Sequence, residues 1–193
     1  MSTPKALCFA WLFFASATAW ADPCEDLYRA YAKLLAAKSF RATVTDVKKG
    51  RQSARMEFVA PNRYHMTTGQ STEQTIVGDD AWTNVGGRML KLPVPVGKII
   101  AQYRNEQALK ELRKNDKVVE LGDDMVDGEP AKVYRYIATH PAKADVKVWV
   151  SRQSGYVMQL ESEGSFMGVK STTRVRYSDF DDPNIEIALP KNA

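Results

Sequence analysis

Apolar and polar residues alternate one by one along most of this chain, and turn residues interrupt the alternation every few positions. In the stretch 40–45, for example, Phe40, Ala42 and Val44 alternate with arginine and threonine. A period of two places apolar side chains on one face of a β-strand and polar ones on the other. Repeated over many short segments, it is typical of an antiparallel sheet with one wet face.

About eleven segments carry this pattern or a short apolar run bounded by turn residues. They predict strands at 40–45, 54–58, 64–66, 76–77, 82–85, 89–92, 118–125, 133–138, 146–150, 156–160 and 169–180. Strands this numerous on turns this short indicate one large, strongly curved sheet or a barrel. No linker, low-complexity run or clear repeat divides 22–193, so we predict one domain there.

Three short helices are predicted beside the strands. The residues 22–25 are a strong helix start, with an aspartate that can cap, a proline at the first helical position and a glutamate that completes a capping box. Apolar residues at helical spacing continue this helix to about Ala37. In mid-chain, 96–103 and the stretch after Asn105 predict two more short helices that interrupt the sheet.

The first 21 residues have the three parts of a secretory signal peptide. Lys5 supplies a short basic start, 6–20 contain no charged residue, and Ala19-Trp20-Ala21 is an A-x-A cleavage site. A retained membrane anchor is the weaker alternative, because a span needs about 20 apolar residues and this run is shorter. No other apolar run approaches that length, so we expect a soluble mature protein.

We therefore expect the secreted protein to begin at Asp22, and the intact mass of the purified protein checks this. A species that keeps residues 1–21, or an acyl group on Cys24, contradicts the expectation.

Cys24 is the single cysteine after 21, so an internal disulfide is excluded in the mature chain. A buried or idle thiol is favoured over a disulfide between two chains.

The motifs of common catalytic sites are missing from the sequence. It has no G-x-S-x-G, no G-x-x-x-x-G-K and no G-x-G-x-x-G. His65 lies in an alternating strand and His140 in a His-Pro turn, where surface or turn positions are favoured over a catalytic base. Two cysteines and two histidines also exclude Cys₄ zinc sites and histidine-rich metal sites. We predict no enzyme activity, no metal and no cofactor.

The net charge does not point to nucleic acid. The sequence has 27 basic and 23 acidic residues, a formal charge of +4, and the two signs are interleaved throughout. So mild an excess does not by itself indicate a nucleic-acid partner.

Three short helices are a small cover for a sheet of this width. A wide antiparallel sheet has to bury its apolar face, and an incomplete cover leaves an apolar cavity that can bind apolar ligands. Methionine suits such a lining because it packs against varied shapes. A dry core with methionine as filler is the alternative, and periodicity does not choose between the two.

We predict that inward positions of the strands and of the first mid-chain helix line this cavity. On 146–150, the three valines face inward while Lys147 and Trp149 face outward, because alternate residues point to opposite faces. The full set of predicted ligand-binding residues is Met56, Phe58, Tyr64, Met66, Ile99, Ile100, Tyr103, Val148, Met158 and Leu160.

Five local segments occur in an order found in a known family. They are Phe40–Val44, Phe58–Tyr64, Ile76–Trp82, Val148–Leu160 and Tyr177–Pro190. Together with the signal peptide, first helix and helical interruption, they resemble the periplasmic carriers of outer-membrane lipoproteins, the LolA-like proteins. Each segment alone is a weak signal, and the specificity lies in their order.

The resemblance implies a mainly β (α+β) fold, a curved antiparallel half-barrel of about eleven strands closed by short lid helices. It also implies a periplasmic carrier that holds the acyl chains of a lipid or lipoprotein for transport to, or sorting at, the outer membrane. Its partners would be envelope proteins that donate or accept the cargo, with only transient membrane contact. The alternative is a sensor on the same fold that binds a protein partner, for which the tip Gly164–Gly168 is suited.

One position departs from the family pattern. The carrier has a cavity arginine immediately before its Pro-Asn break, thought to hold the empty lid shut, and this sequence has Ala60 there. Arg63 is nearby but out of register. The lid mechanism of the carrier is therefore not carried over.

Overall fold

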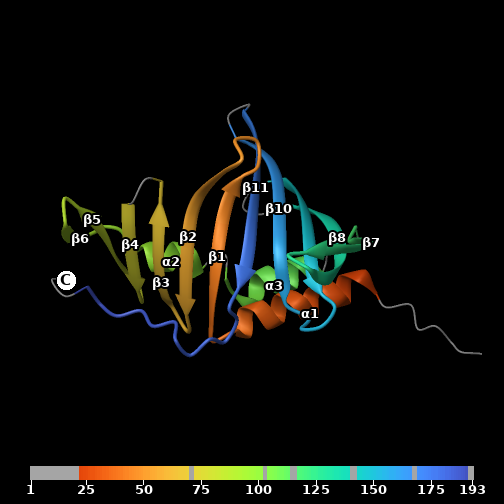
Figure 1. Cartoon of the computed structure of the whole chain (residues 1–193), viewed down its shortest axis with the longest axis horizontal. Helices are drawn as coiled ribbons and strands as arrows, with labels where there is room; N and C mark the ends of the chain where they lie inside the picture. Colours follow the sequence, from red (N-terminus) through yellow and green to blue (C-terminus); the bar gives the residue numbers. More distant parts are fainter. Residues whose placement is uncertain are drawn as a thin grey trace, which may run out of the picture.

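Eleven strands and three helices follow one another along the chain (Figure 1). The structure is a computed structural model that describes residues 22–190 apart from 70–71, 102–103, 114–116, 140–142 and 167–168. The predicted signal peptide, Tyr103 and His140 lie outside the described residues. The elements are α1 (Pro23–Ala36), β1 (Ser39–Asp46), β2 (Arg51–Val59), β3 (Arg63–Thr68), β4 (Thr72–Val77), β5 (Asp80–Val85), β6 (Arg88–Lys91), α2 (Val96–Ala101), α3 (Glu106–Arg113), β7 (Val119–Val126), β8 (Glu129–Ala138), β9 (Ala144–Ser151), β10 (Val157–Phe166) and β11 (Val169–Ser178).

All eleven strands belong to one antiparallel sheet. Its order is β6-β5-β4-β3-β2-β1-β11-β10-β9-β8-β7, so each strand pairs with its sequence neighbour and the first strand meets the last in the middle. β6 and β7 are the two edges, and the sheet bends strongly between them without closing (Figure 1). The predicted curved half-barrel is confirmed, and the closed-barrel alternative is wrong.

Helix α1 begins at the predicted position and with the predicted aspartate cap. The carboxylate of Asp22 accepts a hydrogen bond from the backbone N–H of Cys24 at 2.9 Å, and Pro23 occupies the first turn. The helix buries one stripe, which consists of Leu27, Ala30 and Leu34. This stripe packs against one face of the sheet, which we call the concave face; the opposite face is the convex face.

Several contacts join α1 to α3. The half-buried thiol of Cys24 donates to the carbonyl of Leu112 at 3.5 Å, and burial raises the pKa of that thiol. Arg113 pairs with Glu25 at 2.9 Å. The thiol therefore lies half-buried between two helices.

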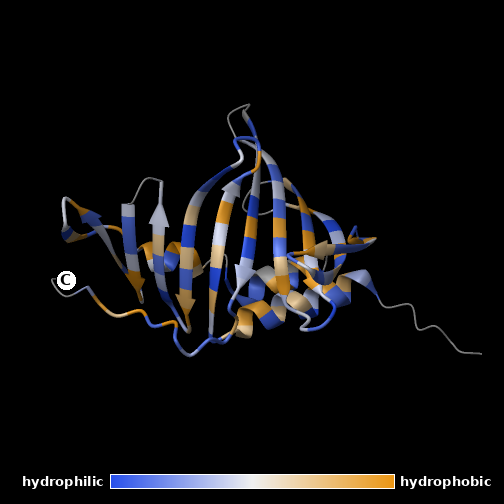
Figure 2. Ribbon diagram, in the orientation of Figure 1, coloured by the Kyte–Doolittle hydropathy of each residue, from blue (hydrophilic) through white to orange (hydrophobic). Residues whose placement is uncertain are grey.

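The alternation along β9 sorts its residues onto two faces as predicted, and Figure 2 shows the same alternation on most strands. The three valines of β9 join the core around α1, and Lys147 is exposed. Trp149 lies on the convex face in a small second cluster, where its indole Nε1 donates to Asp124 at 2.8 Å. That cluster also contains Val126, Ala131, Val133 and Met158.

The predicted inward orientation of Met158 is wrong. Val157 pairs with an inward valine of β9, whereas Gln159 pairs with the outward Trp149, so Met158 is the extra residue of a β-bulge. A bulge shifts the alternation by one position. Met158 therefore packs beside Trp149 on the convex face, while Leu160 remains on the concave face.

Gly97 allows α2 to pack directly on the turn between β4 and β5. Its N–H donates to the carbonyl of Asp79 at 3.3 Å. A Cβ at position 97 would lie 1.9 Å from the carbonyl oxygen of Gly78. Only a residue without a side chain fits here, so the position of α2 over β4 and β5 depends on this glycine.

We expect Gly97→Ala to displace α2 and to lower the free energy of unfolding by about 1–3 kcal/mol. Gly164→Ala is the matched control, because a Cβ there meets no atom closer than 3.8 Å. Thermal unfolding of both variants measures the difference. Equal melting temperatures would show that α2 does not depend on the close approach.

Candidate functional site

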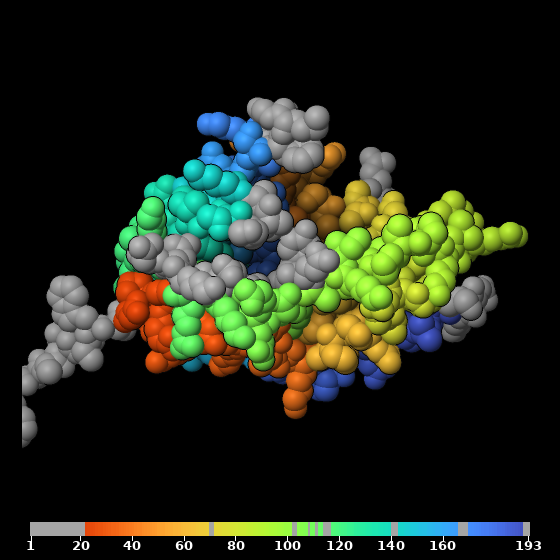
Figure 3. Space-filling view, turned by 180° about the vertical axis from the view of Figure 1, so that it is seen from behind, coloured from red at the N-terminus to blue at the C-terminus, as the bar shows by residue number. Residues whose placement is uncertain are grey.

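The concave side of the molecule is hollowed. Figure 3 shows a depression between β8 and β9 (teal) on one side and β1 and β2 (orange to brown) on the other, with the blue of the last strands deep inside. The helices bound it along its lower side. In the part of the chain that the structure describes, the helical cover therefore extends over only part of the concave face.

Beneath the helices, the concave face is sealed by aromatic side chains. Phe40, Phe58 and Tyr64 are all buried, and Phe58 is 1% exposed. The ring centroids of Phe40 and Phe58 are 4.9 Å apart, and those of Phe58 and Tyr64 are 5.0 Å apart. Val148, another predicted lining residue, is also fully buried. These residues form packed core at the base of the hollow.

Beyond the helices, the concave face carries half-buried apolar side chains. Met56 and Met66 are direct cross-strand partners on β2 and β3. Val175 on β11 pairs with Leu160 on β10 and, on its other side, with Val44 on β1. Met56, Met66, Leu160 and Val175 pack against the core without being fully covered. Val44 is also half-buried. Met56, Met66 and Leu160 therefore occupy the kind of position that the sequence predicted.

The two isoleucines of α2 point in different directions. Ile100 packs against the core, whereas Ile99 is 48% exposed. Consecutive helical residues lie about 100° apart around the axis, so a short helix cannot turn both toward the sheet. The predicted inward position of Ile99 is wrong, and that of Tyr103 lies outside the described residues.

Arg104, between α2 and α3, is the residue at this site that the sequence did not reveal. Its guanidinium carbon lies 4.0 Å from the ring centroid of Phe58 and 5.1 Å from that of Phe40. Its Nη2 donates to the carbonyls of Leu34 and Leu35 at 3.1 Å each. Arg104 thus binds the C-terminal carbonyls of α1, where a cation also stabilises the helix dipole.

The environment of Arg104 is aromatic and poorly hydrated. Burial lowers the pKa of its guanidinium. Burial also raises the pKa of Tyr64, and raises that of Tyr177 to about 12, while the charge of Arg104 lowers both. Ala60, the position where the carrier has its arginine, is exposed. The cation at the base of the hollow thus comes from the helical interruption, and a lone arginine in a loop gives no sequence signal of burial.

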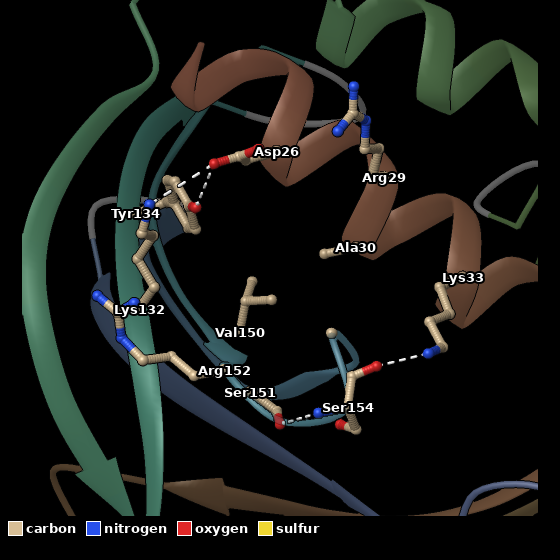
Figure 4. Close-up of a pocket in the computed structure, with 11 residues that line it drawn as sticks. Asp26, Arg29, Ala30, Lys33, Lys132, Tyr134, Val150, Ser151, Arg152 and Ser154 are labelled. Atoms are coloured by element: carbon tan, nitrogen blue, oxygen red, sulfur yellow. Dashed lines mark hydrogen bonds and ion pairs between the residues drawn. The ribbon is translucent and has the colours of Figure 1, made fainter. Parts of the chain in front are cut away.

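A second, polar pocket of about 340 Å³ lies between α1 and the β8–β9 side of the sheet (Figure 4). Lys132 lies 3.6 Å from Asp26 and 3.0 Å from Glu120, and Arg152 pairs with Asp123. Both Lys132 and Arg152 thus form ion pairs with carboxylates of the protein itself. The lining consists of Asp26, Arg29, Ala30, Lys33, Lys132, Tyr134, Val150, Ser151, Arg152, Ser154 and Gly155.

Neither a membrane span nor a metal site is found in the part of the chain that the structure describes. None of its helices combines the length and hydropathy of a bilayer crossing. No three histidine, cysteine or carboxylate side chains among these residues are grouped closely enough to hold a metal ion.

Solved structures of other proteins share this fold, and one of them is named as a lipoprotein. Lipoprotein LppX of Mycobacterium tuberculosis matches with a TM-score of 0.66 and 11% identity, over 86% of this chain and 98% of that one. LprF of Mycobacterium bovis matches with a TM-score of 0.64 and 12% identity, over 89% and 97%. MucB matches with a TM-score of 0.54 and 10% identity, over 90% of this chain and 65% of that one.

Comparisons of the sequence with protein-family models and with curated proteins find no match. At identities of 10–12% the structural likeness shows the fold alone. The chain has a LolA-like fold, an open antiparallel half-barrel with a partial helical cover, and the architecture that the sequence resemblance implied is confirmed.

The sealed base and the open wall should respond differently to truncation. We expect Phe58→Ala to cost about 3–5 kcal/mol of unfolding free energy, because it empties a fully packed site. Met66→Ala should cost clearly less, because Met66 is only half-buried. Urea unfolding of the two variants measures both values. Equal losses would mean that the wall is packed as tightly as the base.

Proposed function

We propose that this protein is an exported carrier of the periplasm that binds the acyl chains of a lipid or lipoprotein against its concave face. The half-buried apolar side chains of Met56, Met66, Leu160 and Val175 on the concave face are the observation that supports this proposal. Carrying cargo to, or sorting it at, the outer membrane would be its task. Envelope proteins would donate and accept the cargo.

The energetics of apolar burial favour an acyl chain as the occupant. Each methylene removed from water contributes about 0.8 kcal/mol, so a long chain gains enough to offset its ordering cost. Methionine side chains adapt to chains of different length and branching. Aromatic side chains close the base, so a chain would enter from the open end of the hollow.

We expect Met66→Lys to weaken binding of an uncharged fluorescent long-chain alcohol by about tenfold or more, because an unpaired charge in an apolar wall costs several kcal/mol. Titration of the probe into purified protein measures the affinity. The fold should survive, because a half-buried wall position can hydrate.

Met125→Lys is the matched control, since Met125 is 59% exposed on edge strand β7. It should leave the affinity for the probe unchanged. Equal affinities in wild type and Met66→Lys, or no binding of the probe by wild type, contradict the carrier proposal. Unfolding of Met66→Lys alone would favour the dry-core alternative.

Edge strand β7 supports a second candidate, a sensor that binds a protein partner. Val119, Leu121 and Met125 are each 49–59% exposed on this edge. An apolar edge strand can pair with an extended segment of another protein. Native mass spectrometry of protein purified from periplasm separates the two functions: carried lipid supports the carrier, and a stoichiometric protein supports the sensor.

A further inference from the structure

Arg104 is a cation at an apolar site without an acidic partner in the described residues. Its two hydrogen bonds go to backbone carbonyls of α1, and its guanidinium lies over the rings of Phe58 and Phe40. Both hydrogen bonds use Nη2, so the N–H groups of Nε and Nη1 have no partner in the part of the chain that the structure describes. Carrying an unpaired charge into such a site is costly unless something compensates it.

Two tyrosines flank the aromatic pair beneath the guanidinium. The ring of Tyr64 is 5.0 Å from that of Phe58, and the ring of Tyr177 is 5.6 Å from that of Phe40. In the described residues neither hydroxyl donates or accepts a hydrogen bond. By contrast, the hydroxyls of Tyr31 on α1 and Tyr136 on β8 form a hydrogen bond with each other at 3.2 Å.

The free polar groups around Arg104 are not completely covered by the described residues. Among the described residues, Trp82 Nε1 is the one side-chain polar atom that is fully buried without a partner. Arg104 and Tyr177 are half-buried and Tyr64 is 6% exposed, and none of their polar side-chain atoms is both fully buried and unpartnered in the described residues. Met56, two positions before Phe58, is the neighbouring inward residue of β2 and lies about 7 Å away along the strand.

We propose that the ligand of the concave hollow is an anionic amphiphile, whose single carboxylate or phosphate group pairs with Arg104 beside the hydroxyls of Tyr64 and Tyr177. Its acyl chain then extends over Met56 and Met66. This inference rests on the proposed carrier function and names the chemical class of the cargo. A charged hydrogen bond to an anion is stronger than one between neutral groups, and a guanidinium holds carboxylate and phosphate oxygens equally well.

The affinities of three probes of equal chain length test the proposal on the full mature chain. They are myristate, myristoyl lysophosphatidate and tetradecanol, each titrated below the concentration at which it forms micelles. We expect wild type to bind one or both anions about ten- to a hundredfold more tightly than tetradecanol. A preference between the two anions identifies the source as a fatty acid or a phospholipid.

Three variants and one control test whether Arg104 and the two tyrosines produce the preference for the anionic probes. Arg104→Gln should remove most of it while keeping an amide donor for the carbonyls of α1, and Arg104→Lys should keep part of it. Arg55→Gln is the charge-matched control, because Arg55 is exposed on β2 on the opposite face to Met56. The double variant Tyr64→Phe with Tyr177→Phe leaves the α1 contacts intact, and should lower the preference several-fold even if Arg104→Gln proves unstable.

The results that would contradict the anionic class of the ligand differ from the result that would contradict the carrier function. If wild type binds tetradecanol as tightly as both anions, the anionic class is wrong and the carrier proposal stands. If Arg104→Gln and the tyrosine double variant both keep the full preference, the placement of the headgroup at Arg104 and the two tyrosines is wrong and the carrier proposal stands. If no probe binds, the carrier proposal fails and the anionic class fails with it.

Discussion

The contact between one stripe of α1 and the concave face of the sheet is the interaction on which the rest of the structure depends. An open sheet of eleven strands cannot bury its inner face by closing on itself, so a helix has to cover it. Leu27, Ala30 and Leu34 do this against a core that draws on strands from both halves of the sheet. Because β1 pairs with β11, that core spans the junction between the two ends of the chain.

The cover is small, and its size determines the character of the site. α1 and the two short mid-chain helices seal the aromatic base, and the apolar wall that continues beyond them stays half-covered. A soluble protein rarely leaves a contiguous apolar surface open without a binding role. The same arrangement brings Arg104 onto the aromatic base, because its guanidinium also binds the C-terminal carbonyls of α1. The structure thus combines an apolar wall with one cation at its closed end.

Local irregularities such as a β-bulge or a glycine determine where individual side chains lie, as the regular alternation of the strands does. The bulge in β10 moves Met158 to the convex face and makes it part of the cluster around Trp149. The missing side chain at Gly97 lets α2 pack on the β4–β5 turn, and this determines which of its isoleucines faces the core. The irregular tail buries Ile185 and Ile187, and Arg63 holds it by donating to the carbonyl of Ile187 at 2.8 Å.

The sequence alone determined the antiparallel sheet, its number of strands, the start of α1 and the faces of most strands. These follow from local rules: a period of two, turn residues, and a capping aspartate before a proline. Met56, Met66 and Leu160 could be placed because nothing interrupts the alternation near them. Tertiary structure decided the rest. Whether Ile99 or Ile100 faces inward, and whether Met158 follows a bulge, depends on neighbours far away in sequence. The burial of Arg104 depends on where the end of α1 lies, and no pattern within the chain encodes that distance.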